Sequence, residues 1–220
     1  LMIVEVCANS YESAINAEVG GANRIELCKD LHLDGLTPDY EIAKKTINEL
    51  NIPVFILIRP REGDFNYSNE EFELMKADIV KFKEMGCKGI VSGVLNDDKT
   101  IDLERTKELV KLTRPLEFTF HRAFDVVSDP FKEIEKLIEL GIDRVLTSGQ
   151  EERAVDGLDL LETLHKIAKN RIKIMPGSGI NKSNIVNFKK FKEIHEEKDI
   201  WRELELLEIL FLVLYHKDHL

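Results

Sequence analysis

The segment IVEVCANSYESAINAEVGGANRIELC (residues 3–28) reads as a strand, a helix and a second strand. In both strands, apolar residues alternate with polar ones, so Glu5 and Cys7 share one face, as do Glu26 and Cys28. Parallel strands that are joined by a helix bury their apolar face under that helix. We therefore expect these Glu and Cys side chains to point to the side of the sheet away from the helices.

Strand-like and helix-like segments keep alternating along the rest of the chain, which is typical of a parallel α/β fold. Eight strands in 220 residues predict a single-domain (β/α)8 TIM-type barrel over residues 1–220, with its functional site at the carboxyl ends of the strands. An open doubly wound sheet is the alternative, because the eighth unit has the weakest and least regular pattern. The predicted strands are Ile3–Cys7, Arg24–Cys28, Val54–Ile58, Gly89–Ser92, Glu117–His121, Arg144–Ser148, Ile172–Met175 and Lys192–His195. The predicted helices are Ser10–Val19, Asp39–Leu50, Asn69–Met85, Leu103–Leu112, Pro130–Leu140, Ala154–Lys169 and Lys182–Phe188.

Composition and charge exclude several function classes. The formal net charge of −10 repels phosphate backbones, so we expect no nucleic-acid partner. The most apolar stretch, Leu204–Tyr215, contains acidic residues and is too short to cross a bilayer, so we expect no membrane partner. Three cysteines in a chain of this length do not form a disulfide framework and indicate a reducing, cytoplasmic environment.

Two of these cysteines form a candidate metal site. Cys7 and Cys28 occupy matching positions at the ends of neighbouring predicted strands, which lie about 4.8 Å apart in a sheet. Two thiolates suit a soft ion such as Cu(I) better than a hard one. The alternatives are two packed core cysteines or an adventitious disulfide. The third, Cys87, is expected to be a small core residue at the opposite face.

Charged residues follow the third and fifth predicted strands. Arg59 and Arg61 flank a proline at the end of one strand and predict a cationic rim for a small anionic ligand. The other strand ends in His121, which we expect to act as a base or ligand that Asp125 orients. Arg122 lies beside it and is assigned to the same anion-binding set. A purely structural alternative is that Arg59, Arg61 and Arg122 pair with the buried carboxylates of Glu5 and Glu26.

Glycine-rich turns follow the sixth and seventh predicted strands. Such turns expose backbone N–H groups, and many barrels hold an anion near their last two strands. The residues assigned to this anion site are Ser148, Gly149, Gly177, Ser178 and Gly179. The alternative is a pair of tight turns without a ligand.

Several motifs together resemble the CutC family, whose members are associated with copper homeostasis. They are residues 5–28, GLTP at Gly35–Pro38, IRPREGDFNYS at residues 58–68, TFHRAFD at 119–125, RVLTSGQ at 144–150, IMPGSGI followed by NKSNI at 174–185, and EIH at Glu193–His195. The resemblance implies a cytoplasmic (β/α)8 barrel that forms homodimers or larger homo-oligomers. It also implies Cu(I) bound at Cys7 and Cys28. Residues 196–220 depart from the family pattern, although a leucine stripe there (Leu204, Leu207, Leu210, Leu214) is compatible with a final helix.

Two functional hypotheses follow from these residues. The first is a copper homeostasis protein that binds Cu(I) through paired cysteine thiolates. The second is an enzyme that acts on a small phosphorylated or carboxylated substrate, with Glu26 or His121 as acid or base and the arginines as charge-neutralising groups. A structural or interaction module has no positive support, because it does not explain polar residues on inward-facing strand positions.

Overall fold

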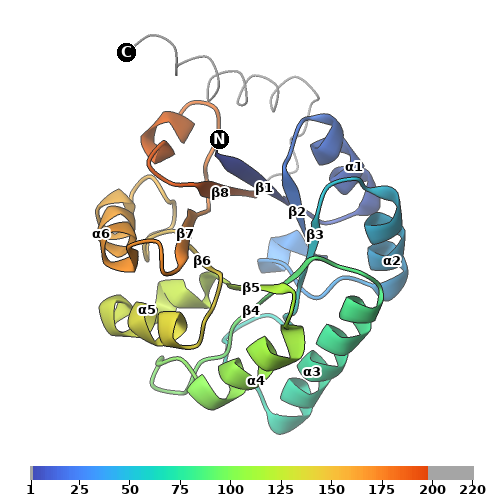
Figure 1. Cartoon of the computed structure of the whole chain (residues 1–220), viewed down its shortest axis with the longest axis horizontal. Helices are drawn as coiled ribbons and strands as arrows, with labels where there is room; N and C mark the ends of the chain where they lie inside the picture. Colours follow the sequence, from blue (N-terminus) through green and yellow to red (C-terminus); the bar gives the residue numbers. More distant parts are fainter. Residues whose placement is uncertain (1, 198–220) are drawn as a thin grey trace.

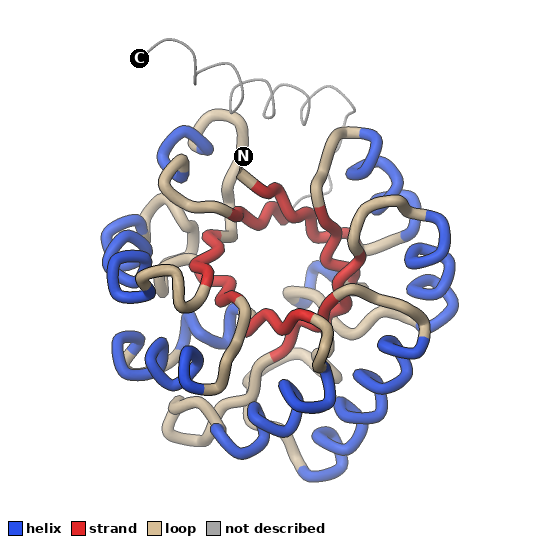
Figure 2. Tube along the Cα trace, viewed as in Figure 1, coloured by secondary structure: helices blue, strands red, loops and turns tan. Residues whose placement is uncertain are grey.

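The computed structural model describes residues 2–197, which form one ring of parallel strands (Figures 1 and 2). The sheet order is β7-β6-β5-β4-β3-β2-β1-β8, so β1 pairs with both β2 and β8 and the ring is nearly closed. This confirms the TIM-type (β/α)8 barrel and excludes the open doubly wound sheet. The strands are β1 (Ile3–Ala8), β2 (Arg24–Leu27), β3 (Val54–Leu57), β4 (Gly89–Ser92), β5 (Glu117–Phe120), β6 (Arg144–Thr147), β7 (Lys173–Pro176) and β8 (Glu193–Glu197).

Helices surround this ring on its outside (Figure 2). The α-helices are α1 (Tyr11–Val19), α2 (Tyr40–Glu49), α3 (Asn69–Glu84), α4 (Leu103–Thr113), α5 (Pro130–Glu139) and α6 (Leu158–Ala168). Short 3-10 helices are η1 (Leu31–Leu33), η2 (Arg122–Val126) and η3 (Ile185–Phe188). Side-chain caps explain two helix starts: Ser68 forms a capping box with Glu71, and Asp129 accepts from the amides of Phe131 and Lys132.

Two predicted helices differ from the structure. The segment predicted from Ala154 becomes helical only at Leu158, and the segment predicted from Lys182 forms only the 3-10 turn η3. In the second case, Asn181 and Asn184 each accept a backbone amide hydrogen bond with their side-chain oxygen. These local bonds compete with an α-helical turn, which explains the difference.

The alternation along β1 and β2 separates two packing regions, as the sequence predicts. Outward-facing residues such as Val4 and Ile25 belong to the large core beneath the helices. Cys7 and Cys28 instead pack with Phe55, Leu57 and Val91 in a separate cluster inside the ring. The inward-facing positions of β1 and β2 therefore carry the side chains that line the interior of the barrel.

The predicted leucine stripe at Leu204, Leu207, Leu210 and Leu214 lies outside the described residues. Within residues 2–197, no helix combines the length and the apolar character needed to cross a bilayer.

Candidate functional site

A cavity of about 410 Å³ opens at the carboxyl ends of the strands. Among the polar side chains that line it are those of Cys7, Glu26, Arg59, His121, Arg122, Asp125 and His195. These residues come from β1, β2 and β8, or from the segments that come after β3 and β5 in the chain, including η2. The cavity therefore lies where the sequence predicts the functional site.

The sulfurs of Cys7 and Cys28 lie 3.4 Å apart, and both residues are buried and form no disulfide within residues 2–197. Their backbone positions are not matched, however, contrary to the sequence-based expectation. Cys7 pairs with Glu26, and the amide of Cys28 donates to the carbonyl of Ala8. Strands in a barrel are tilted and staggered, so inward-facing side chains meet diagonally across the pair. The thiols meet despite this offset.

A second set of donor atoms shares Cys7. The ligand-capable atoms of Cys7, Glu26 and His195 all lie within 4.8 Å of one another, and all three residues are buried. Because β2, β1 and β8 are adjacent in the sheet, residues that are far apart in the sequence become neighbours. The interior thus offers sulfur, oxygen and nitrogen donors close to one point.

Glu5 fixes the position of His195. Its Oε1 lies 2.8 Å from His195 Nδ1, and its other oxygen accepts a hydrogen bond from Arg24. Complete burial favours a raised pKa for Glu5, but Arg24, the His195 hydrogen bond and Arg144 outweigh it and hold the pKa well below its usual range. Glu5 is therefore an ionised carboxylate that accepts from both neighbours.

A layer of buried charges lies at the amino-terminal side of these residues. Glu193 accepts from Arg24 at 2.9 Å and from Arg144 at 2.7 Å, and the Phe55 ring lies within 5.1 Å of both guanidinium carbons. A Cβ on Gly89 would lie only 2.5 Å from this ring. Glycine at this position therefore gives Phe55 the space to pack against the two arginines.

The buried carboxylates have partners other than the three arginines of the structural alternative. Glu5 pairs with Arg24 and His195, and Glu26 Oε2 lies 3.6 Å from His195 Nδ1. Arg59, Arg61 and Arg122 occur in none of these ion pairs.

Arg59 is buried, and it donates to the carbonyls of Leu33, Gly35 and Gly63, while its Nε has no hydrogen-bond partner among residues 2–197. It therefore lines the cavity as a cation that is held by backbone dipoles. Arg61 lies elsewhere: it pairs with Glu71 and Asp64 and is not part of the cavity lining.

His121 presents a neutral imidazole to the cavity. Its Nδ1 accepts from the amide of Ala123, and its Nε2 has no partner within the described part of the chain. Burial, together with the charge of Arg59, lowers its pKa to about 3. A Cβ on Gly93 would lie 2.8 Å from the ring, so the glycine permits this close packing.

Asp125 does not orient His121. It accepts instead from Arg122 Nε at 2.9 Å, from the Thr147 hydroxyl, and from the amides of Ser148 and Gln150. The backbone amides of the turn after β6, where the sequence predicts a bound anion, thus donate to the carboxylate of Asp125 in the structure. Arg122 also donates to Ser148 Oγ at 3.3 Å and is held beside the cavity.

The glycine turns serve packing rather than the cavity, whose lining includes none of the five residues assigned to them. Gly149 donates to Thr147 Oγ1, and a side chain there would collide with the backbone of Gly157. A Cβ on Gly177 would lie 2.5 Å from Leu146 and 3.2 Å from His195. Ser178 and Gly179 take positive φ values of 82° and 66°, and the Ser178 hydroxyl donates to Glu152.

Four interior residues had no assigned role in the sequence analysis: Arg24, Arg144, Glu193 and His195. For two of them, Arg24 and Glu193, the sequence does contain a signal. Arg24 is two positions before Glu26, and Glu193 is two positions before His195, so both continue the inward-facing pattern.

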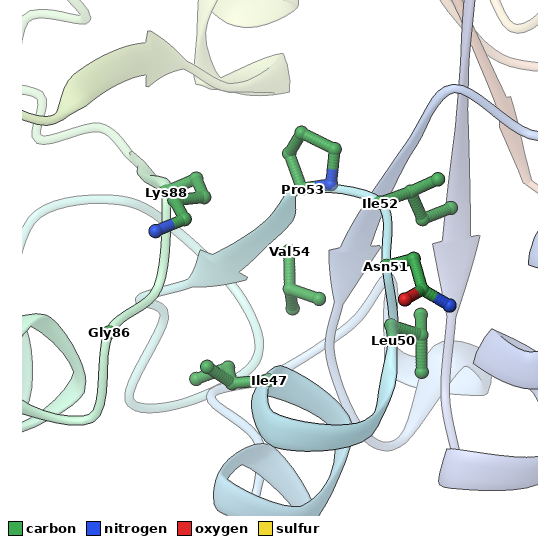
Figure 3. A pocket seen from close by; sticks show the side chains of 8 residues that line it. All are labelled: Ile47, Leu50, Asn51, Ile52, Pro53, Val54, Gly86 and Lys88. Carbon is green, nitrogen blue, oxygen red and sulfur yellow. The ribbon is translucent and has the colours of Figure 1, made fainter.

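A smaller cavity of about 140 Å³ lies near the amino ends of β3 and β4 (Figure 3). Its lining is mainly apolar, with Asn51 and Lys88 as its polar side chains, and it contains no His, Cys, Asp or Glu. Its lining, as far as the structure describes it, therefore lacks the usual side-chain ligands of a metal ion.

Comparisons with known proteins agree with this architecture. A family model described as the CutC family matches residues 2–200. The "Copper homeostasis protein cutC homolog" of Homo sapiens is 50% identical over 183 residues, which are 83% of this chain and 67% of that protein. A family protein CutC of Histophilus somni is 43% identical over 205 residues, 92% of this chain and 84% of that protein. The crystal structure of the putative copper homeostasis protein CutC from Streptococcus agalactiae superposes with a TM-score of 0.84 at 32% identity, covering 89% of this chain and 98% of that one. This chain belongs to the CutC family.

Proposed function

We propose that this protein binds Cu(I) through the thiolates of Cys7 and Cys28 and acts in copper homeostasis in the cytoplasm. One observation carries the proposal: the two sulfurs lie 3.4 Å apart at a buried position. Paired thiolates are soft ligands that select Cu(I). The names of the relatives, which refer to copper homeostasis, support the same assignment.

The route to the thiols supports a site that shields its ion. Cys7 lines the cavity, whereas Cys28 is 1% exposed and packs against Gly35, where a Cβ would lie 3.5 Å from its sulfur. An ion that enters through the cavity therefore meets Cys7 first and Cys28 second. Burial of both sulfurs would also protect bound Cu(I) from oxidants in bulk water.

Anaerobic titration with Cu(I) against a colorimetric Cu(I) chelator tests the proposal. We expect one tightly bound ion per wild-type chain and loss of that binding in Cys7→Ser and Cys28→Ser. Cys87→Ser is the matched control, because Cys87 is also a buried free thiol but lies just before β4, at the amino ends of the strands. Equal affinity in all four proteins would refute the thiol pair as the copper site.

A second function, an enzyme acting on a small phosphorylated or carboxylated substrate, is favoured by the cavity itself. Its volume of about 410 Å³ far exceeds that of one ion, and Arg59 Nε and His121 Nε2 have no protein partner among the described residues. In this proposal Arg59 and Arg122 bind the anion, while Glu26 or His121 transfers a proton.

Thermal-shift screening with sugar phosphates and small carboxylates tests this second function. One ligand class should raise the melting temperature of the wild type and of Arg61→Ala, whose side chain lies outside the cavity, but not that of Arg122→Ala. A screen in which no anion stabilises the wild type would remove the proposal.

The family resemblance also supports a homo-oligomer. Light scattering on the full chain at micromolar concentration measures the molar mass directly. A mass of about 25.3 kDa, that of one chain, would contradict an oligomer.

A further inference from the structure

We propose that Cys7, Glu26 and His195 form a second metal site, which binds one divalent ion of borderline softness such as Zn(II). The three donor atoms lie within 4.8 Å of one another on β1, β2 and β8. Glu26 on β2 lies directly across from Cys7. His195 on β8 lies across from Glu5, which is two residues before Cys7 and faces inward as well. One ion placed among these strands can therefore reach all three side chains.

The donor set differs in chemistry from the cysteine pair. A thiolate, an imidazole nitrogen and a carboxylate oxygen are the ligand types of protein zinc sites, whereas carboxylates suit Cu(I) poorly. Ionised Cys7 and Glu26 with a neutral His195 carry two negative charges, which match a divalent ion. Cys28 lies outside this group of mutually close donors, although its sulfur is 3.4 Å from that of Cys7.

The residue behind His195 supports a ligand role. Glu5 is ion-paired with Arg24, so its carboxylate accepts, and His195 Nδ1 donates across the 2.8 Å contact. A neutral imidazole that donates from Nδ1 keeps its lone pair on Nε2. A carboxylate that fixes the tautomer and the ring orientation in this way is the usual arrangement behind a metal-binding histidine.

Three protein ligands leave a fourth position on a tetrahedral ion, as in catalytic zinc sites. Cys7, Glu26 and His195 all line the cavity, which also contains Arg59 and Arg122. The proposed ion therefore has space for an oxygen ligand from water or from a small anion. The two metal sites share Cys7, so occupation of one excludes the other. The divalent site does not depend on copper binding by the cysteine pair.

Titrations with Zn(II) and Co(II) of the reduced full-length chain test the proposal. We expect one Zn(II) per chain, and a thiolate-to-cobalt charge-transfer band in the Co(II) spectrum with the intensity of four-coordination. Glu26→Gln should weaken Zn(II) binding about tenfold or more and leave Cu(I) binding unchanged. Cys28→Ser should abolish tight Cu(I) binding and retain Zn(II), and Cys7→Ser should lose both metals. Asp34→Asn is the matched control, since Asp34 is a cavity carboxylate outside the donor set.

The outcomes separate this site from the copper site. If Cys28→Ser no longer binds Cu(I) but still binds Zn(II), the result supports two overlapping sites that share Cys7. A Co(II) spectrum without a thiolate band, or equal Zn(II) affinity in wild type and Glu26→Gln, would overturn the divalent site and leave the thiol pair untouched. The wild-type Co(II) spectrum needs no variant, so the test holds even where Glu26→Gln does not fold.

Discussion

Replacement of Arg24 by methionine should destabilise the barrel strongly, because it leaves a charge buried. Arg24 on β2 is the cationic partner of Glu5, whose side chain is fully buried, and it also bonds Glu193. Methionine retains much of the apolar stem but supplies no charge. Glu193 keeps Arg144 and Lys173 as partners, whereas Glu5 keeps only the His195 hydrogen bond among its described side-chain contacts.

The expected magnitude follows from this difference. Removing one partner of a buried ion pair costs about 3–5 kcal/mol, which for a chain of this size lowers the melting temperature by roughly 6–20 °C. Arg61→Met is the control, since Arg61 and its partners are partly exposed and the loss there should stay near 1 kcal/mol or below. Urea unfolding at pH 7, followed by circular dichroism, measures both variants.

The double variant Arg24→Met/Glu5→Gln isolates the buried charge. Glutamine still accepts a hydrogen bond but is neutral, so the double variant should be more stable than Arg24→Met alone by about 1–3 kcal/mol. Because the folded-state pKa of Glu5 is lowered, its ion pair stabilises the protein above the unfolded-state pKa near 4.5 and loses this effect as the pH falls below that value. The gap between wild type and Arg24→Met should therefore narrow in acid. A loss below about 1 kcal/mol for Arg24→Met, or additive losses in the double variant, would refute this reasoning.

Three further predictions concern packing, pH and a turn. Gly89→Ala should cost about 1–3 kcal/mol in urea unfolding, because its Cβ would overlap the Phe55 ring, and an unchanged midpoint would contradict the packing. The pKa of His121 in the folded protein is lowered to about 3. Between pH 6.5 and pH 3, the unfolded chain therefore binds a proton at this residue that the folded chain does not bind. The free energy of unfolding should thus fall, as the pH is lowered through this range, by up to about 1.4 kcal/mol per pH unit. His121→Gln should flatten this slope, and an equal slope in both proteins would show that the imidazole is not buried in its neutral form. Asp125→Asn should cost about 1.5–3 kcal/mol and speed hydrogen exchange at the Ser148 amide, which would exchange at the wild-type rate if Asp125 were not its acceptor.

The inward positions of Glu5, Cys7, Glu26 and Cys28 were predictable, because side-chain direction along a strand depends only on a period of two. The offset between Cys7 and Cys28 was not, because the stagger between neighbouring strands is set when the whole ring closes. Local sequence therefore predicted which face each thiol occupies, and barrel closure determined how the thiols meet.

The partners of the buried acids also depend partly on local sequence and partly on barrel closure. Glu5 and His195 are 190 positions apart in the sequence and meet because β8 pairs with β1. No local pattern reveals such a pair, so His195 was placed on a strand without a role. Arg24 was within reach of sequence reasoning, because its position two residues before Glu26 gives it the same face. Asp125 accepts hydrogen bonds from the amides of Ser148 and Gln150 in the turn after β6. The spacing of residues in the sequence did not predict that this turn lies against Asp125.

The burial of the thiols bears on how copper would be used. Direct transfer from protein to protein requires that a partner's ligands reach the bound ion before it leaves. Cys7 is 5% exposed and Cys28 is 1% exposed, and the way in passes through a cavity lined by Arg59 and Arg122. Beneath them, an ion pair joins Arg24 to Glu5 and a hydrogen bond joins Glu5 to His195, and these buried contacts resist movement of the strands. A rigid, enclosed site of this kind favours retention of an ion, or its use with a small molecule in the cavity, over rapid exchange with another protein.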